Sequence, residues 1–207
     1  MTHPPLSTLE ALRACIADDH PERRYFIDFD YTLMLASSTD TYLQSARPKL
    51  FFWPVLKAIG LFRPWVLRGQ NGVFLYRDAM RLAVLERLRP NLMTDLEQRA
   101  VQVFETHENK ALVETLQEIP ADRIVIVSFG LTKVIKALLK QTPFEQSTVV
   151  ASQSDQLVDD RRAGKLKMLE KAGYFPNPEL DVVVSDSYRD DKDLLEFVNH
   201  NFYIKWD

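Results

Sequence analysis

Four short apolar segments alternate with helical patterns along this chain, and three of them are directly followed by a polar residue. The segments cover residues 25–27, 124–127, 149–150 and 182–184. Runs this short that are apolar throughout are typical of strands buried on both faces, and strands that alternate with helices form parallel sheets. The pattern therefore predicts an α/β fold, with a Rossmann-like parallel sheet core covered by helices.

Helical patterns occupy the intervals between these segments. They cover residues 132–139, 166–171 and 193–198. A first amphipathic helix is expected to begin at Ser7, because Ser7-x-x-Glu10 has the form of a capping box. The short tail of the chain leaves room for one helix and an edge strand.

A long stretch after the first predicted strand breaks the alternation. It contains no convincing strand but several helical patterns, including 72–88 and 94–116, and the second has its own capping box in Thr94-x-x-Glu97. An all-helical insertion at this point would form a cap over the carboxyl ends of the strands. We therefore expect residues 1–34 and 120–207 to form the catalytic core and residues 35–119 to form a helical cap domain.

Composition narrows the class of protein. The formal net charge of the 207 residues is -3, so no overall positive charge suggests a nucleic-acid partner. Cys15 is the single cysteine, which excludes an internal disulfide and a multi-cysteine metal site and fits a cytoplasmic setting. The chain opens without a signal-peptide pattern. Charged residues and prolines interrupt the longest apolar run, 50–67, so it is not expected to span a membrane.

Pairs of acidic residues follow two of the predicted strands. Asp28 and Asp30 can converge on one point, where one carboxylate attacks an electrophile and the other handles the proton of the leaving group. Asp186 and Asp190 follow the fourth apolar segment. Taken singly, each acid could simply end a strand or cap a helix. Together they repel one another unless a cation offsets their charge, and hard oxygen ligands suit Mg²⁺.

Two further positions could bind an anion at the same edge of the sheet. Ser128 follows the second apolar segment, and its hydroxyl with the backbone N–H groups around Phe129 and Gly130 could cradle an oxyanion. A helix-capping serine is the alternative. Lys165 would be an ordinary solvated lysine if judged alone, but beside a phosphate and Asp28 it would complete the charge balance.

As a set, these residues resemble the four motifs of the haloacid dehalogenase (HAD) superfamily. The matching motifs are Asp28-x-Asp30-x-Thr32, Ser128, Gly164-Lys165 and Asp186-Ser187-x-x-Asp190. The resemblance implies a phosphatase in which Asp28 attacks phosphorus to form an aspartyl-phosphate and Asp30 acts as general acid and base. It also implies that Mg²⁺ is held by Asp28, the backbone carbonyl of Asp30 and Asp186, with Asp190 supporting. Ser128 and Lys165 would bind the phosphate.

The second acid separates branches of that superfamily. Its dehalogenases lack an aspartate two residues after the nucleophile and its P-type ATPases carry threonine there, so Asp30 favours phosphate-ester chemistry. The helical insertion resembles the type 1 cap of phosphoserine-phosphatase-like members. Residues 64–69 more loosely resemble the cap of HAD domains fused to UbiA-type prenyltransferases. Tyr31 departs from the pattern, because the family usually has glycine at that position.

Two other functions stay open beside hydrolysis of a phosphomonoester. A phosphotransferase or phosphomutase would pass the phosphoryl group to another hydroxyl, and the sequence does not separate it from a hydrolase. A catalytically weak phosphate-binding module would keep the pocket without turnover. Retention of every charged catalytic position argues against this module, while Tyr31 leaves it open.

The insertion contains a basic, aromatic stretch. Residues 41–77 include six basic residues and no acidic one, with aromatic residues among them. The aromatic side chains could form the core of the cap, or the stretch could lie on anionic lipid. We expect the first, because Pro54 and Pro64 break the continuous face that an interfacial helix needs. The expected partner is a small-molecule phosphate ester. Nucleic acid is not an expected partner, and contact of residues 47–68 with a membrane is the less favoured alternative.

Overall fold

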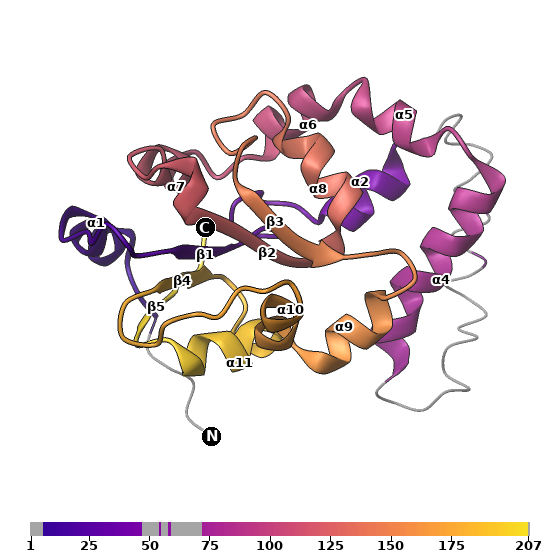
Figure 1. Ribbon diagram of the computed structural model, residues 1–207. Helices are drawn as coiled ribbons and strands as arrows, with labels where there is room; N and C mark the ends of the chain where they lie inside the picture. Colours follow the sequence, from indigo (N-terminus) through magenta and orange to yellow (C-terminus); the bar gives the residue numbers. More distant parts are fainter. Residues whose placement is uncertain (1–5, 47–53, 55–57, 59–71, 207) are drawn as a thin grey trace.

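The computed structural model describes residues 6–46, 54, 58 and 72–206. Its strands form one sheet in the order β3-β2-β1-β4-β5, and every neighbouring pair is parallel, so the predicted α/β fold is confirmed (Figure 1). The strands are β1 (Tyr25–Asp28), β2 (Ile124–Leu131), β3 (Thr148–Ser152), β4 (Val182–Ser185) and β5 (His200–Tyr203).

Helices connect these strands and extend beyond them. They are α1 (Leu9–Ala17), α2 (Ser38–Gln44), α4 (Gly72–Leu88), α5 (Leu92–Glu97), α6 (Ala100–His107), α7 (Lys110–Leu116), α8 (Thr132–Leu139), α9 (Leu157–Ala163), α10 (Lys165–Lys171) and α11 (Tyr188–Phe197), with a 3-10 turn at Ala121–Arg123. The tail forms α11 and the edge strand β5, as its length allowed.

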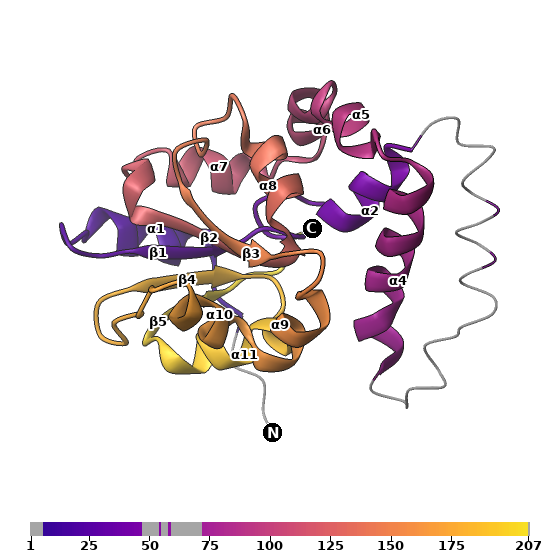
Figure 2. The ribbon, with the colours of Figure 1, turned by 45° about the vertical axis from the view of Figure 1, so that its right-hand side comes forward.

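The sheet is covered on both faces (Figures 1 and 2). Alternate residues of a strand point to opposite faces, and β1 is buried throughout. Tyr25 and Ile27 belong to the apolar cluster that includes side chains of α1, α7 and α8, whereas Phe26 packs with α10 and α11. This two-sided burial explains why the strand segments are apolar at every position.

The strand order brings three strand ends together. The chain leaves β1 for β2 on one side and returns to β4 on the other, so the carboxyl ends of these strands meet where the order reverses. Asp28 is the last residue of β1 and pairs with Val127 of β2. Ser128 therefore lies beside it on β2, and Asp186 directly follows β4 on the other side.

Much of the stretch between β1 and β2 is built of helices. α4 packs against α2 and α9 (Figure 2). An ion pair of 3.7 Å joins Arg161 of α9 to Asp78 of α4. α7, although within residues 35–119, lies beside α1 on the sheet, where Arg13 Nε donates to Thr115 Oγ1 at 3.2 Å. The domain boundaries near residues 34 and 120 stay a prediction.

Both predicted capping boxes are wrong. Thr8, not Ser7, caps α1, because its hydroxyl accepts the N–H of Ala11 at 3.2 Å. The single helix expected over 94–116 is divided into α5, α6 and α7, and Thr94 lies inside α5. One of the breaks is fixed by Asn109, whose side chain caps α7.

Two elements near the strand ends are longer than predicted. β2 continues through Ser128 to Leu131, with an irregular register between those residues. α11 begins at Tyr188 rather than at 193, because the Ser187 hydroxyl accepts the N–H of Asp190 and caps the helix there.

The residues for which membrane contact was considered lie largely outside the described part of the chain. Almost all of 47–68 and of the apolar run 50–67 lies there. Within the part of the chain that is described, no helix combines the length and the apolar character needed to cross a membrane.

Candidate active site

The loop after β1 is a tight turn that fixes the side chains it carries. The N–H of Leu33 donates back to the carbonyl of Asp28 at 3.3 Å. Asn109 anchors the loop from α7 by donating its side-chain amide to the carbonyl of Thr32 at 2.9 Å. Asp28 is 8% exposed at the end of β1, so its carboxylate mainly faces other protein groups rather than water.

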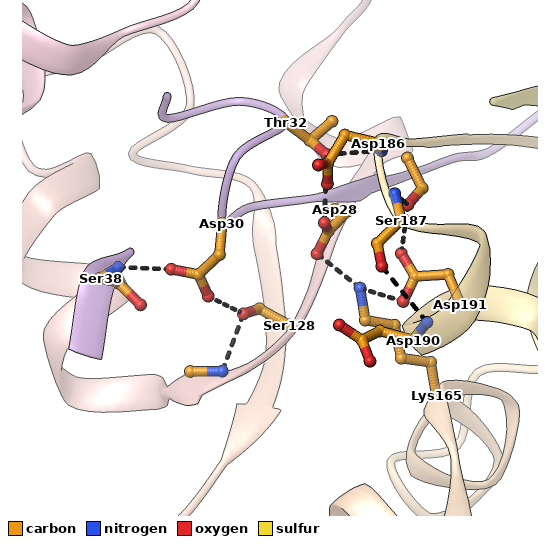
Figure 3. A network of polar contacts seen from close by, with 12 residues as sticks. Asp28, Asp30, Thr32, Ser38, Ser128, Lys165, Asp186, Ser187, Asp190 and Asp191 are labelled. Atoms are coloured by element: carbon orange, nitrogen blue, oxygen red, sulfur yellow. Dashed lines mark hydrogen bonds and ion pairs between the residues drawn. The ribbon is translucent and has the colours of Figure 1, made fainter. Parts of the chain in front are cut away.

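Lys165 lies between two buried carboxylates (Figure 3). Its Nζ is 2.5 Å from Asp28 Oδ1 and 2.6 Å from Asp191 Oδ1. The lysine is 2% exposed. A lysine buried in this way is held by its charge, because an unpaired buried ammonium is strongly unfavourable.

Gly164 allows Lys165 to reach this position. Its φ of +91° lies in the left-handed region that favours glycine. A side chain there would also collide with Asp193 of α11, whose Oδ2 accepts the N–H of Leu166 at 2.8 Å. Glycine therefore lets α10 begin directly against α11, with Lys165 turned toward Asp28.

Thr32 joins the acids of β1 and β4. Its Oγ1 lies 3.1 Å from Asp28 Oδ2 and 3.2 Å from Asp186 Oδ1, so its one proton can be given to either carboxylate. The same oxygen accepts the N–H of Asp186 at 3.0 Å. The carboxylates of Asp28 and Asp186 therefore converge on one point, as Figure 3 shows.

Asp30 is turned away from that point toward β2 and α2 (Figure 3). Its Oδ2 accepts the Ser128 hydroxyl at 2.8 Å, and its Oδ1 accepts the backbone N–H of Ser38, the first residue of α2. The two acids of the motif thus have separate surroundings, since Asp28 is paired with an ammonium and Asp30 with neutral donors. That separation suits one nucleophile and one proton carrier.

The residues after Ser128 fit closely around Asp30. The N–H of Gly130 donates to the Ser128 hydroxyl at 2.8 Å, and a side chain at Gly130 would meet Asp30 and Ser38. The ring of Phe129 lies beneath two cations, with Lys165 Nζ 5.6 Å and the Arg161 guanidinium 5.9 Å from its centre. The segment 128–130 therefore lies between the carboxylate of Asp30 and the cations of Lys165 and Arg161.

Asp191 is the site residue that the sequence pattern did not single out. The predicted supporting ligand, Asp190, has an exposed side chain, and its role stays a prediction. The chain departs from helical geometry at Asp191, with φ -114° and ψ 15°, and its buried carboxylate accepts the Ser185 hydroxyl at 2.5 Å. Only this local kink distinguishes Asp191 from Asp190, and no residue type in the sequence predicts the kink.

The site carries more negative charge than its lysine offsets. Burial raises the pKa of Asp28 well above its ordinary value, although Lys165 opposes the shift, and the Asp191 carboxylate adds to it. Burial also raises the pKa of Asp191 and of Asp186. Burial alone would lower the pKa of Lys165, but Asp191 and Asp28 outweigh it and raise that pKa, so the ammonium keeps its charge.

A divalent cation fits this set of groups. Among the described residues no group of three or more His, Cys, Asp or Glu side chains could hold a metal ion. Magnesium needs no such cage, since it is commonly bound by one or two carboxylates and keeps several waters. Asp28 and Asp186 supply two carboxylates on either side of Thr32, and their raised pKa values mean that a cation between them would relieve an unfavourable burial of charge.

The chain is thus an α/β protein with buried carboxylates and a buried lysine at the carboxyl ends of an all-parallel sheet. No family model matches the chain, and no curated protein matches it. Among solved structures, it is similar to the crystal structure of a phosphoserine phosphohydrolase-like protein from Francisella tularensis subsp. tularensis SCHU S4. The two chains are 21% identical, the match covers 84% of this chain and 82% of the other, and the TM-score is 0.48.

Proposed function

We propose that this protein is a magnesium-dependent phosphatase that hydrolyses a phosphomonoester through an aspartyl-phosphate at Asp28. The observation that carries the proposal is the pairing of Asp28 with Lys165 at 2.5 Å while Asp30, two residues later, is held separately by Ser128 and Ser38. The buried ammonium opposes the rise in the pKa of Asp28 that burial causes, and so favours the ionised carboxylate that attacks. The second can exchange a proton.

In the first step, an Asp28 carboxylate oxygen forms a bond to phosphorus as the bond from phosphorus to the ester oxygen breaks. Protonated Asp30 gives its proton to that leaving oxygen, and an alcohol departs. Lys165 stays beside the attacking oxygen and offsets the negative charge of the incoming phosphate. Asp28 then carries the phosphoryl group.

In the second step, a water oxygen attacks phosphorus and the bond from phosphorus to Asp28 breaks. Asp30, now ionised, takes a proton from that water, so phosphate leaves and both acids return to their first state. The Ser128 hydroxyl and the N–H groups after it bind phosphate oxygens, for which Ser128 has to turn from Asp30, its partner at 2.8 Å.

Asp28, Asp186 and the backbone carbonyl of Asp30 would hold Mg²⁺, with Asp190 nearby in support. When bound, the ion supplies positive charge that neutralises phosphate oxygens and orients them for in-line attack. The raised pKa values of Asp28 and Asp186 support this assignment, because both carboxylates ionise more readily beside a cation.

Residues 35–119 are proposed to cap the site. Their first helix contributes the Ser38 N–H to Asp30, and α4 is paired with the core through Asp78 and Arg161. A cap of this kind decides which leaving groups and which acceptors reach the aspartyl-phosphate. Hydrolysis therefore requires that water, rather than a second hydroxyl compound, reaches phosphorus.

The test is phosphate release from p-nitrophenyl phosphate with Mg²⁺ and with excess chelator. We expect release with Mg²⁺ and its loss with chelator, while the circular-dichroism spectrum stays unchanged. Asp28→Asn should reduce turnover by several orders of magnitude, each factor of ten being about 1.4 kcal/mol. The matched control is Asp122→Asn. Asp122 is exposed and lies just before the amino end of β2, away from the site at its carboxyl end, so this variant should keep full activity. Turnover by Asp28→Asn above about a tenth of the unsubstituted rate would refute the proposal.

A further inference from the structure

The sheet has two edge strands, β3 and β5, and the outer side of β5 is occupied by the chain itself. The N–H of Ile204, just after β5, donates to the carbonyl of Ser185 in β4 at 3.0 Å. Successive residues of an extended chain direct their backbone groups to opposite sides, so the carbonyl of Tyr203 points away from β4. It accepts the N–H of Ser7 at 2.8 Å. The segment before α1 therefore covers this edge.

The outer side of β3 has no such cover in the described part of the chain. β3 pairs with β2, and no strand within residues 6–46 and 72–206 pairs with its other side. Proteins commonly protect an exposed edge strand with charged residues or proline, because its unpaired backbone groups can bind another chain. Residues 146–154, which contain β3, include neither. This edge is thus open to a further strand.

A groove of about 400 Å³ lies at the same edge. It is lined by residues 148–151 of β3, by Thr132 and Lys136 of α8, and by Met168 and Lys171 of α10. The two helices pack with different apolar clusters and cover opposite faces of the sheet (Figure 2). Because β2 occupies the inner side of β3, a groove that touches β3 and both helices lies along its free edge.

The walls of this groove present positive charge. Lys136 is exposed and makes no ion pair with the described residues. The side chain of Lys171 is 63% exposed. The one acid of the lining, Asp160, is 7% exposed and lies 3.8 Å from Lys171. A ligand in the groove therefore meets an ammonium group from each face of the sheet, while the carboxylate is largely covered.

A second copy of this chain fits the edge poorly. Two copies joined along β3 would be related by a two-fold axis, which places both α8 helices on the same face of the joined sheet. The exposed Lys136 of each copy would then lie near the junction, where like charges repel. An acidic strand meets the same lysines with opposite charge, so charge complementarity favours a different partner.

We infer that the free edge of β3 binds an extended, acidic segment of another protein, which joins the sheet as a further strand. Backbone hydrogen bonds to β3 supply the part of the affinity that does not depend on sequence. Side chains of an extended segment alternate between the two faces, so neighbouring acids reach Lys136 on one face and Lys171 on the other. This inference does not depend on the phosphatase activity.

The test measures fluorescence anisotropy of labelled peptides with the folded chain. The first peptide is Thr-Val-Glu-Glu-Val-Thr, about the length of a typical strand. The second has glutamine in place of both glutamates, and the third is the acidic peptide with all its backbone N–H groups methylated. The proteins are the unsubstituted chain, Lys136→Glu and Lys140→Glu. Lys140→Glu is the matched control, because this lysine is also exposed at the end of α8 but does not line the groove.

The acidic peptide should bind the unsubstituted chain, and the glutamine peptide should bind about threefold to thirtyfold more weakly, because each exposed ion pair contributes up to about a factor of five. The methylated peptide keeps the charges but cannot donate to β3, so its affinity should fall by about tenfold or more. Lys136→Glu should weaken binding of the acidic peptide about threefold to tenfold. Lys140→Glu should change it by less than about twofold.

Four results would overturn the inference. Failure of the acidic peptide to bind would show that the edge accepts no such strand. Equal binding of the methylated peptide would show that the contact is not made by strand addition. Equal losses in Lys136→Glu and Lys140→Glu would show that the charge acts over the whole surface rather than in the groove. A chain that sediments as a dimer and binds the acidic and glutamine peptides equally would assign the edge to a second copy.

Discussion

The side-chain amide of Asn109 donates to the backbone carbonyl of Thr32 at 2.9 Å, and with the Asn109 N–H, which donates to the carbonyl of Leu33 at 3.0 Å, it ties the loop of the candidate nucleophile to the start of α7. The same side chain caps α7 by accepting the N–H of Leu112 at 3.3 Å. Asn109 is 4% exposed, so neither group it serves can turn to water instead. Asn109 and Thr32 are separated in the sequence by most of the proposed cap, and their contact holds the turn that follows β1.

Asn109→Ala should therefore lower the free energy of unfolding by about 1–3 kcal/mol, because it removes a cap and leaves a buried carbonyl without its donor. Urea unfolding measures the change. The control is Asn91→Ala, at the N-cap of α5, whose side chain makes no capping hydrogen bond; it should change stability by less than about 0.5 kcal/mol. Equal losses in the two variants would contradict the role given to Asn109.

Gly164→Ala should impair both stability and turnover. The new methyl group meets Asp193 and the backbone keeps a positive φ, so α10 must shift and carry Lys165 with it. Gly173→Ala is the matched control, because its φ is +84° and nothing lies within 4 Å of the added methyl group. Both should lose about 1–2 kcal/mol from backbone strain, but only Gly164→Ala should also lose about tenfold or more in kcat/KM. Equal kcat/KM values would show that the position of Lys165 does not depend on Gly164.

The buried charges predict a compensating pair of substitutions. Lys165→Met leaves the carboxylates of Asp28 and Asp191 buried without their cation, which should cost about 3–5 kcal/mol. Adding Asp191→Asn removes one of the two unpaired charges, so the double variant should be more stable than Lys165→Met alone. Chemical unfolding of the single and double variants gives the coupling. Additive losses would mean that the three groups do not act as one network.

Two buried tyrosines predict the response to alkali. Burial and the Asp19 carboxylate raise the pKa of Tyr25, and burial and Glu86 raise the pKa of Tyr42. The unfolded chain therefore loses these protons first, and the stability they contribute is complete below about pH 10 and is lost as pH rises above it. Thermal melts from pH 8 to 11 should show a shallower loss in the Tyr25→Phe/Tyr42→Phe variant than in the unsubstituted protein. A parallel loss in both would contradict the assignment.

The strands of this fold could be predicted from the sequence because each is buried on both faces and is therefore apolar at successive positions. The strand ends also predict the places of Asp28, Ser128 and Asp186, since the carboxyl ends of parallel strands meet at one edge of a sheet. The structure brings these residues together, while their chemical roles stay proposals.

The parts that could not be predicted depend on tertiary contacts. Asp190 and Asp191 are adjacent and chemically identical, and a local departure from helical geometry decides which one meets Lys165. The cap of α1 is Thr8 rather than Ser7, although both are good N-cap residues. Asn109 lies far from Thr32 in sequence, and only the folded chain shows that its amide supports the site.

The most direct test of the account asks which residue carries the phosphoryl group. In Asp30→Asn, p-nitrophenyl phosphate should still react, because nitrophenolate leaves without being protonated, but the second step lacks its base. Acid quenching during turnover with Mg²⁺, followed by peptide mass spectrometry, should then find one phosphoryl group on the peptide that contains Asp28. Release of nitrophenol with no phosphorylated peptide, or with the phosphoryl group on another residue, would contradict the assignment of Asp28 as the nucleophile.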